Sequence, residues 1–305
     1  MRDFSKYRGI FPAFYACYEA DGTVSSARTK ALARYFVEKG VKGVYVNGSS
    51  GECIYLSVEE RKQILEAVMA EAKGKLTVIC HVACNNTADS AALAAHAESL
   101  GADAIASIPP IYFHLPEHAI AAYWNDISAA APNTDFIIYN IPQLAGVSLT
   151  MPLFRKMLEN PRVIGVKNSS MPVQDIQMFK AEGGENCVVF NGPDEQFVAG
   201  RAIGADGGIG GTYGAMPDLF LKMDALLAEG KAKEAQALQY AVNEIIYKMC
   251  SGHGSMYAVI KGVLRKNEDL DIGGVRAPLA NLVPEDEAVV EDAAKMICEA
   301  RERFL

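Results

Sequence analysis

Short apolar segments of five to seven residues recur along the chain, and polar residues separate them at steady intervals. They are rich in Val and Ile and alternate little between polar and apolar positions, which is typical of strands that are buried on both faces. We predict eight strands, Gly9–Tyr15, Gly43–Asn47, Leu76–Val82, Ala104–Ile108, Phe136–Asn140, Val163–Lys167, Cys187–Asn191 and Asp206–Gly210.

Segments with helical spacing lie between these strands, namely Val24–Lys39, Val58–Lys73, Ala88–Leu100, Glu117–Ala131, Pro152–Glu159, Val173–Glu182 and Glu195–Ile203. Ser57, with Glu60 three residues later, predicts a capping box at the second of these helices. Thr150 with Pro152 is a common start for another. Strict alternation of strand and helix indicates a parallel sheet, and eight such units in about two hundred residues predict an α/β fold, a (β/α)8 TIM barrel.

The strand pattern stops after Gly214. Four further helices are predicted, Pro217–Glu229, Ala232–Cys250, Met256–Leu264 and Pro284–Phe304. We therefore expect a catalytic barrel over residues 1–216 and a C-terminal helical extension over residues 217–305 that packs on the barrel.

Composition excludes several classes of protein. The 305 residues carry a net charge of −8 and no cluster of Lys and Arg, so we expect no binding of nucleic acid. No apolar run has membrane-spanning length, and the first residues lack the apolar core of a signal peptide. We therefore expect a cytoplasmic protein with no membrane partner.

The seven cysteines are scattered without the spacing of a disulfide framework, as expected for free thiols in a reducing compartment. The segment Cys80-His81-Val82-Ala83-Cys84 comes nearest to a metal-binding pattern. Because no second pair of ligands accompanies it, we predict no metal site.

Lys167 ends a strand that should be buried, and its position is unusual for a lysine. Burial removes water from an ammonium group and so favours the neutral amine. A neutral amine attacks ketones and forms a Schiff base. The alternative is a lysine with a packed stem and a charged end that reaches water. The strand alone leaves both interpretations open.

Other polar residues follow the carboxyl ends of the predicted strands, where active sites of such barrels are built. Gly48–Gly51 offers hydroxyls and amides that could bind a carboxylate, although a plain loop would look similar. We expect Val163, Gly165 and Lys167 to face the barrel interior, with Gly165 leaving room below a substrate. Tyr139 would then share the interior with Lys167, either as a proton shuttle or as a packed ring.

Two further features lie at the ends of later strands. Asp194 and Glu195 could accept hydrogen bonds from sugar hydroxyls, or they could stabilise the start of a helix through its dipole. The glycine-rich segment Gly207–Gly211 lacks the nearby cations of a phosphate site. We interpret its glycines as positions where a substrate approaches the backbone.

Four motifs taken together resemble the N-acetylneuraminate lyase and dihydrodipicolinate synthase family of class I aldolases. They are Gly48-Ser49-Ser50-Gly51-Glu52, Tyr139-Asn140-Ile141-Pro142, Gly165-Val166-Lys167 and the segment Gly204–Gly210. The resemblance covers nearly the whole chain. Within the family it is strongest to the lyases, because of the segments Ile141–Val147 and Asn191–Glu195.

The resemblance implies a role for each residue of these motifs. Lys167 would form the Schiff base, and Tyr139 would move the proton. Ser49 and Ser50 would hold the carboxylate of the keto acid. Tyr112 would reach across a subunit interface and complete a proton relay with Tyr139 and Ser49. Contacts with the polyol tail are implied for Ser169, Gly192, Asp194, Glu195 and Gly211.

The resemblance also implies an activity, the cleavage of N-acetylneuraminate to N-acetylmannosamine and pyruvate in a homotetramer without a metal or organic cofactor. Gly211 departs from the bacterial lyases, which usually carry Ser there, so another 2-keto-3-deoxy sugar acid stays open. A dihydrodipicolinate synthase is a second alternative, but such enzymes place an arginine shortly after the Tyr-Asn-x-Pro turn. Here Gln143-Leu144-Ala145 supplies no cation. A keto-acid-binding barrel without catalysis is a third.

Overall fold

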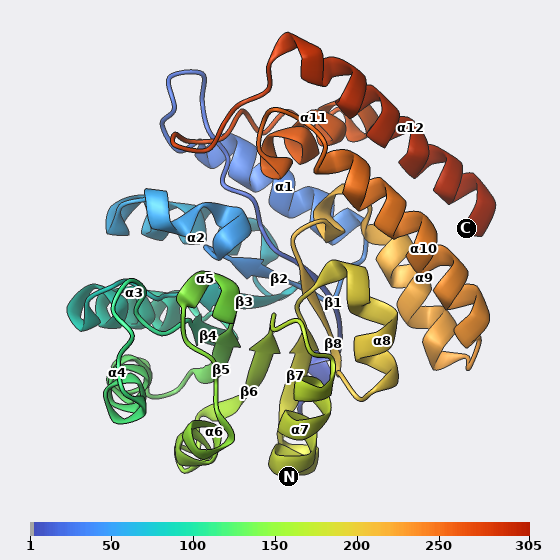
Figure 1. The fold of residues 1–305 in the computed structure, drawn as a ribbon. Coiled ribbons are helices and arrows are strands. Elements are labelled where there is room, and N and C mark those ends of the chain that lie inside the picture. The colour runs from blue at the N-terminus through green and yellow to red at the C-terminus, as the bar shows by residue number, and fades with distance from the viewer. Residues whose placement is uncertain (1–2) are drawn as a thin grey trace.

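The computed structural model describes residues 3–305, and its centre is a barrel of parallel strands (Figure 1). The strands are β1 (Gly9–Pro12), β2 (Gly43–Val46), β3 (Thr77–His81), β4 (Ala104–Ser107), β5 (Asp135–Asn140), β6 (Val163–Asn168), β7 (Val188–Asn191) and β8 (Gly207–Gly210). Their order in the sheet is β1-β8-β7-β6-β5-β4-β3-β2. The edges β1 and β2 meet where Phe14 N donates to Tyr45 O at 2.9 Å. The predicted (β/α)8 TIM barrel is therefore confirmed.

Helices lie between successive strands and cover the outside of the barrel (Figure 1). They are α1 (Ser26–Glu38), α2 (Val58–Ala72), α3 (Thr87–Leu100), α4 (Glu117–Ala130), α6 (Met151–Leu158), α7 (Gln174–Gly183) and α8 (Phe197–Ala202). The predicted capping box is present, because Ser57 Oγ accepts from Glu60 N and Glu60 Oε2 accepts from Ser57 N. The short α5 (Pro142–Ala145) was not predicted, since four residues are too few to show a helical period.

The predicted C-terminal helices are also present, as α9 (Pro217–Ala228), α10 (Ala232–Met249), α11 (Met256–Glu268) and α12 (Glu287–Phe304). Figure 1 shows them in orange and red along one side of the barrel, next to α1. Within residues 3–305, no helix combines the length and apolarity needed to cross a bilayer.

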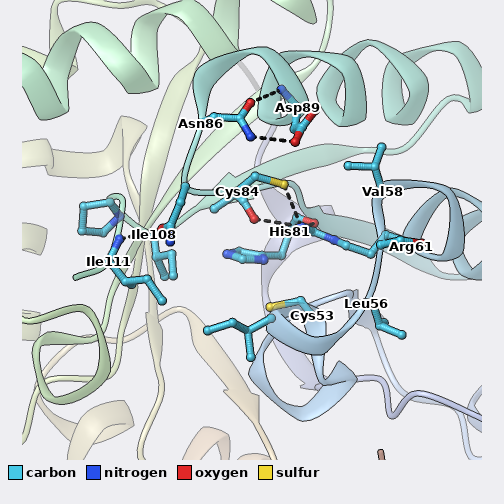
Figure 2. A pocket seen from close by; sticks show the side chains of 15 residues that line it. Cys53, Leu56, Val58, Arg61, His81, Cys84, Asn86, Asp89, Ile108 and Ile111 are labelled. Carbon is cyan, nitrogen blue, oxygen red and sulfur yellow. Dashed lines mark hydrogen bonds between the residues drawn. The ribbon is translucent and has the colours of Figure 1, made fainter. Parts of the chain in front are cut away.

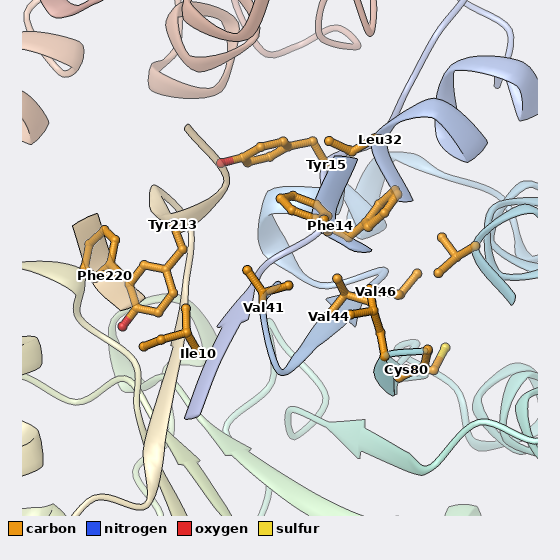
Figure 3. Packing of buried hydrophobic residues seen from close by; sticks show 14 of the residues in the cluster. Ile10, Phe14, Tyr15, Leu32, Val41, Val44, Val46, Cys80, Tyr213 and Phe220 are labelled. Atoms are coloured by element: carbon orange, nitrogen blue, oxygen red, sulfur yellow. The ribbon is translucent and has the colours of Figure 1, made fainter. Parts of the chain in front are cut away.

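Apolar side chains form two clusters, one between the strands and the helices and a smaller one inside the barrel. Figure 3 shows part of the outer cluster, where Ile10 and Val44 point away from the barrel axis toward surrounding helices and loops. Inside, the rings of Phe11 and Phe190 pack edge to face at 5.4 Å. These rings fill part of the barrel interior, and a cavity opens at the carboxyl end of the strands.

β6 does not alternate strictly between the two clusters. Its register against β5 shifts at Ile164, which packs inside the barrel, whereas Val163 packs outside. The prediction that Val163 faces the interior is therefore wrong. A Cβ on Gly165 would lie 1.8 Å from Val188 O. This glycine allows β6 and β7 to approach closely, and its role in leaving room below a substrate stays a prediction.

The glycines of β8 have a similar explanation. A Cβ on Gly207 would lie 2.1 Å from Gly9 O, and one on Gly210 would lie 2.2 Å from Asp194 Oδ1. These positions are filled by the protein itself, so the prediction that they let a substrate approach the backbone is wrong. Gly211, just after the strand, borders a cavity, and for this glycine the approach of a substrate stays a prediction.

Candidate active site

A cavity of about 330 Å³ opens at the carboxyl end of the barrel strands. All site residues predicted from the sequence except Tyr112 line it, namely Ser49, Ser50, Tyr139, Lys167, Ser169, Gly192, Asp194, Glu195 and Gly211. The barrel brings them together because parallel strands end at the same rim.

Lys167 lies inside the barrel on β6, with only 4% of its surface exposed. Its Nζ lies 3.9 Å from the ring centroid of Tyr139 and 4.2 Å from that of Tyr45. Burial lowers the pKa of Lys167 to about 7, although the Asp194 carboxylate opposes this shift. A substantial fraction of the amine is therefore neutral near pH 7, which favours the interpretation of a buried nucleophile.

Tyr139 pairs with Lys167 across β5 and β6 and is equally buried. Burial raises the pKa of Tyr139 to about 12, and hydrogen bonds with the side chains of Ser49 and Ser169 oppose the rise. The phenol is therefore protonated at neutral pH. With a hydroxyl on each side, it can pass one proton on while accepting another.

Ser49–Gly51 form a 3-10 turn shortly after β2, with Asn47 and Gly48 between them. The turn is closed by its own backbone, since Gly51 N donates to Gly48 O and Glu52 N donates to Ser49 O, both at 3.0 Å. The side chains of Ser49 and Ser50 line the cavity beside Lys167. They present two hydroxyls of the kind that a carboxylate can accept from.

Glu52 anchors this turn to the C-terminal helices. Its buried carboxylate accepts hydrogen bonds from Lys261 Nζ at 2.9 Å, Tyr18 Oη at 3.1 Å and Arg276 N at 2.8 Å. Burial lowers the pKa of Lys261, and the Glu52 charge opposes that shift. Because both charges are buried and paired, removing either partner would leave an unpaired charge beneath the turn.

Asp194 opens a short 3-10 turn, Asp194–Gln196, at the end of β7. Its Oδ2 accepts from both the amide and the hydroxyl of Thr212, each at 2.6 Å. Burial raises the pKa of Asp194 to about 6, and these bonds oppose the rise. The carboxylate is thus fixed at the cavity wall, whereas the neighbouring Glu195 lies exposed at the rim.

The cavity also contains residues that the sequence did not mark. Tyr257, Met256 and Ile246 come from the C-terminal helices, and Tyr257 Oη lies 3.4 Å from Ser50 Oγ. Thr212, which holds Asp194, was missed as well. The Ser255 cap before Met256 marks the start of a helix but gives no sign that this helix reaches the barrel rim.

Tyr112 does not line this cavity. It lies between β4 and α4, 86% of its surface is exposed, and its φ is 83°. A positive φ is strained for a tyrosine and is often kept where a side chain has a task. In the single chain the ring contacts Phe113, with centroids 5.0 Å apart. Its action at a neighbouring subunit stays a prediction.

A second cavity, also about 330 Å³, is lined by His81, Cys53 and Cys84 (Figure 2). The His81 ring also packs edge to face on the Tyr139 ring, with centroids 6.0 Å apart. Burial holds the pKa of His81 well below its usual value, so the imidazole is neutral. Within the described chain, no group of three or more His, Cys, Asp and Glu side chains is arranged to hold a metal ion.

Comparisons with known proteins relate this site to a family. A model of the dihydrodipicolinate synthetase family matches residues 6–297. The N-acetylneuraminate lyase of Mediterraneibacter gnavus is 68% identical over 305 residues, which are 100% of this chain and 97% of that protein. The N-acetylneuraminate lyase of Escherichia coli is 35% identical over 239 residues, 78% of this chain and 80% of that protein.

A solved structure agrees with these sequences. The wild-type sialic acid aldolase of Ruminococcus gnavus is 68% identical and superimposes with a TM-score of 0.98. The match covers 99% of this chain and 100% of that one.

Proposed function

Because the chain belongs to the dihydrodipicolinate synthetase family, we propose that it is a Schiff-base aldolase that cleaves N-acetylneuraminate to N-acetylmannosamine and pyruvate. The observation that carries the proposal is the buried Lys167 amine, whose pKa is lowered to about 7, beside the protonated Tyr139 phenol. The names of the curated relatives support N-acetylneuraminate as the substrate.

The reaction begins with the open-chain keto acid, whose carboxylate binds at Ser49 and Ser50. The Lys167 nitrogen attacks the C2 ketone and forms a C–N bond. The ketone oxygen leaves as water, with one hydrogen from the nitrogen and one proton from solvent. The product is an iminium cation, which attracts electrons from the neighbouring carbon–carbon bonds.

Cleavage follows through the proton relay. Tyr139 accepts the proton of the C4 hydroxyl while its own proton passes to the neighbouring Ser49 hydroxyl, which releases its own proton toward the open mouth of the cavity. The electron pair of the C3–C4 bond moves into the iminium, which becomes a neutral enamine, and C4 becomes the aldehyde of N-acetylmannosamine. The enamine then takes a proton at C3, and water hydrolyses the resulting iminium to pyruvate and the free amine.

We further propose a cytoplasmic homotetramer in which Tyr112 of a second copy completes this relay. The exposed side chain of Tyr112 and its positive φ support a contact outside its own chain. The seven free cysteines fit a reducing compartment.

The cavity disfavours a synthase that binds a second carboxylate. Gln143 and Leu144 line it where an arginine would be needed, and neither carries the positive charge that pairs with a second carboxylate. Asp194 and Glu195 add negative charge, which suits the hydroxyls of a polyol and opposes a carboxylate. The missing hydroxyl at Gly211 removes one neutral hydrogen bond, worth about 0.5–1.5 kcal/mol, so it weakens binding without changing the reaction.

The test compares kcat/KM for N-acetylneuraminate cleavage with kcat/KM for condensation of pyruvate with aspartate semialdehyde in one preparation. We expect cleavage to dominate. Faster condensation would contradict the lyase proposal. An adduct with pyruvate but neither reaction would indicate an aldolase for another sugar acid, and Gly211→Ser would then be the first variant to examine.

A further inference from the structure

Tyr45 lies on β2 with its ring inside the barrel, and its side chain is fully buried. Lys167 Nζ lies over the face of this ring, 4.2 Å from its centroid, as well as over the face of Tyr139. The two rings meet edge to face at 5.7 Å and 79°. The reacting nitrogen is therefore bordered by two aromatic faces.

The Tyr45 ring is held firmly in this place. Gly48 directly precedes the Ser49–Gly51 turn. It has no room for a side chain, because a Cβ there would lie 2.6 Å from Tyr45 Cε1. The His81 ring packs nearby, with centroids 6.2 Å apart. The ring thus packs between Gly48 and the Lys167 amine and is closed off from solvent.

The hydroxyl of Tyr45 does not explain this arrangement. Among the described residues, no protein group forms a hydrogen bond with it. Burial raises the pKa of Tyr45 far above its ordinary value, so the phenol does not release a proton at neutral pH. The feature of Tyr45 that meets the reacting nitrogen is the face of its ring.

We propose that the ring face of Tyr45 stabilises the cationic iminium on Lys167. The inference rests on the proposed function, because it concerns the Schiff base of that reaction. The face of an aromatic ring carries negative potential, and its attraction for a cation is strongest where water is excluded. The two ring centroids lie 4.2 and 3.9 Å from Nζ, so both ring faces border the new charge, and Asp194, hydrogen-bonded to Thr212, adds its attraction from the cavity wall.

A series of ring substitutions at position 45 tests the proposal. Tyr45→Phe removes only the hydroxyl, and replacement by mono-, tri- and pentafluorophenylalanine weakens the ring's negative face while nearly keeping its shape. The readout is the pyruvate concentration that gives half-maximal borohydride trapping at Lys167, measured by intact mass. We expect Tyr45→Phe to match the natural chain within about twofold, and trapping to weaken stepwise by about tenfold in total toward the pentafluoro ring.

Phe11 supplies the matched control. It also lies inside the barrel, where it packs against Phe190, and within residues 3–305 no cation lies over its ring. The same fluorinated residues at position 11 should leave the pyruvate dependence unchanged. Thermal midpoints of both series separate an effect on folding from an effect on the iminium.

Each outcome is decisive. Equal trapping across the series at position 45 would show that the ring only fills space and would overturn the proposal. A loss already complete in Tyr45→Phe would assign the effect to the hydroxyl and overturn it as well. If Lys167 is labelled in the unsubstituted chain but trapping does not change across the fluorinated series, this inference alone is contradicted. Absence of label in the natural chain removes the proposed function and this inference together.

Discussion

Lys167 Nζ lies 3.9 Å from the centroid of the Tyr139 ring, and the two residues are direct partners across β5 and β6. This pairing places a nucleophile and a phenol on adjacent strands that face the same side of the barrel wall. Burial acts on them in opposite directions, since it lowers the pKa of Lys167 to about 7 and raises that of Tyr139 to about 12. At neutral pH the amine can attack and the phenol can donate.

Tyr139→Phe separates the hydroxyl from the ring. The ring face over Lys167 is kept, so the adduct with pyruvate should still form. Without the phenol proton, kcat for cleavage should fall by roughly 10²–10⁴-fold, the usual contribution of a positioned acid or base. Steady-state kinetics and borohydride trapping on the same variant give both values. A kcat within a few-fold of the natural chain would assign Tyr139 to packing.

Asp194→Asn tests the acidic wall of the cavity. The amide oxygen can still accept from Thr212, so the local fold should survive. KM for N-acetylneuraminate should rise by about 10- to 100-fold, because hydrogen bonds to a charged acceptor are stronger than those to a neutral one. Pyruvate, which lacks the polyol, should still label Lys167. Equal losses for both ligands would instead show that the wall itself had been damaged, and Thr212→Val is the control for that damage.

The lowered pKa of Lys167 predicts how adduct formation depends on pH. Only the neutral amine attacks, so the rate with pyruvate should rise as pH increases through about 7, where the Lys167 pKa lies, and level off above it. An ordinary lysine, with a pKa near about 10.4, would still gain about tenfold per pH unit at pH 8 to 9. Rapid quenching with borohydride across this range distinguishes the two profiles.

Lys261→Met should destabilise the chain strongly. It leaves the fully buried Glu52 carboxylate without its cation, a change that costs about 3–5 kcal/mol in unfolding free energy. Urea unfolding measures the loss, and Glu52→Gln in the same chain should restore part of it.

The control is the exposed ion pair between Lys266 and Glu291, which has the same 2.9 Å separation. Lys266→Met should change stability by no more than about 1 kcal/mol. A similar small effect of Lys261→Met would mean that Glu52 becomes protonated or hydrated at little cost, contrary to the anchoring role given to it.

Much of the fold could be predicted because apolar runs indicate which segments are buried. They do not indicate, however, where a strand ends or how it pairs with its neighbour. The first predicted strand extends to Tyr15, whereas β1 ends at Pro12, and Phe14 and Tyr15 are buried in the outer cluster outside the strand. Ile164 is an extra residue in β6, so Val163 faces outward where strict alternation from Lys167 predicts that it faces inward. Both residues are apolar and β-branched, and the sequence therefore gives no sign of the shift.

The site residues could be predicted where a polar residue ends an apolar strand, because that position is unusual in the sequence itself. Lys167 and Tyr139 stand out because polar groups end apolar strands, and the four motifs around them indicated a family that the comparisons confirm. Tyr257 and Thr212 have no such signal. Tyr257 reaches the rim only because α11 packs against the barrel, and Thr212 matters only because Asp194 turns back to it.

The most direct test of the account is to treat the chain with pyruvate and borohydride and map the modified peptide. We predict one covalent pyruvate-derived label per chain, located on Lys167. Lys167→Arg, which keeps a cation but cannot supply a neutral amine, should take up no label. A label on another lysine, or none in a folded chain, would contradict the Schiff-base mechanism.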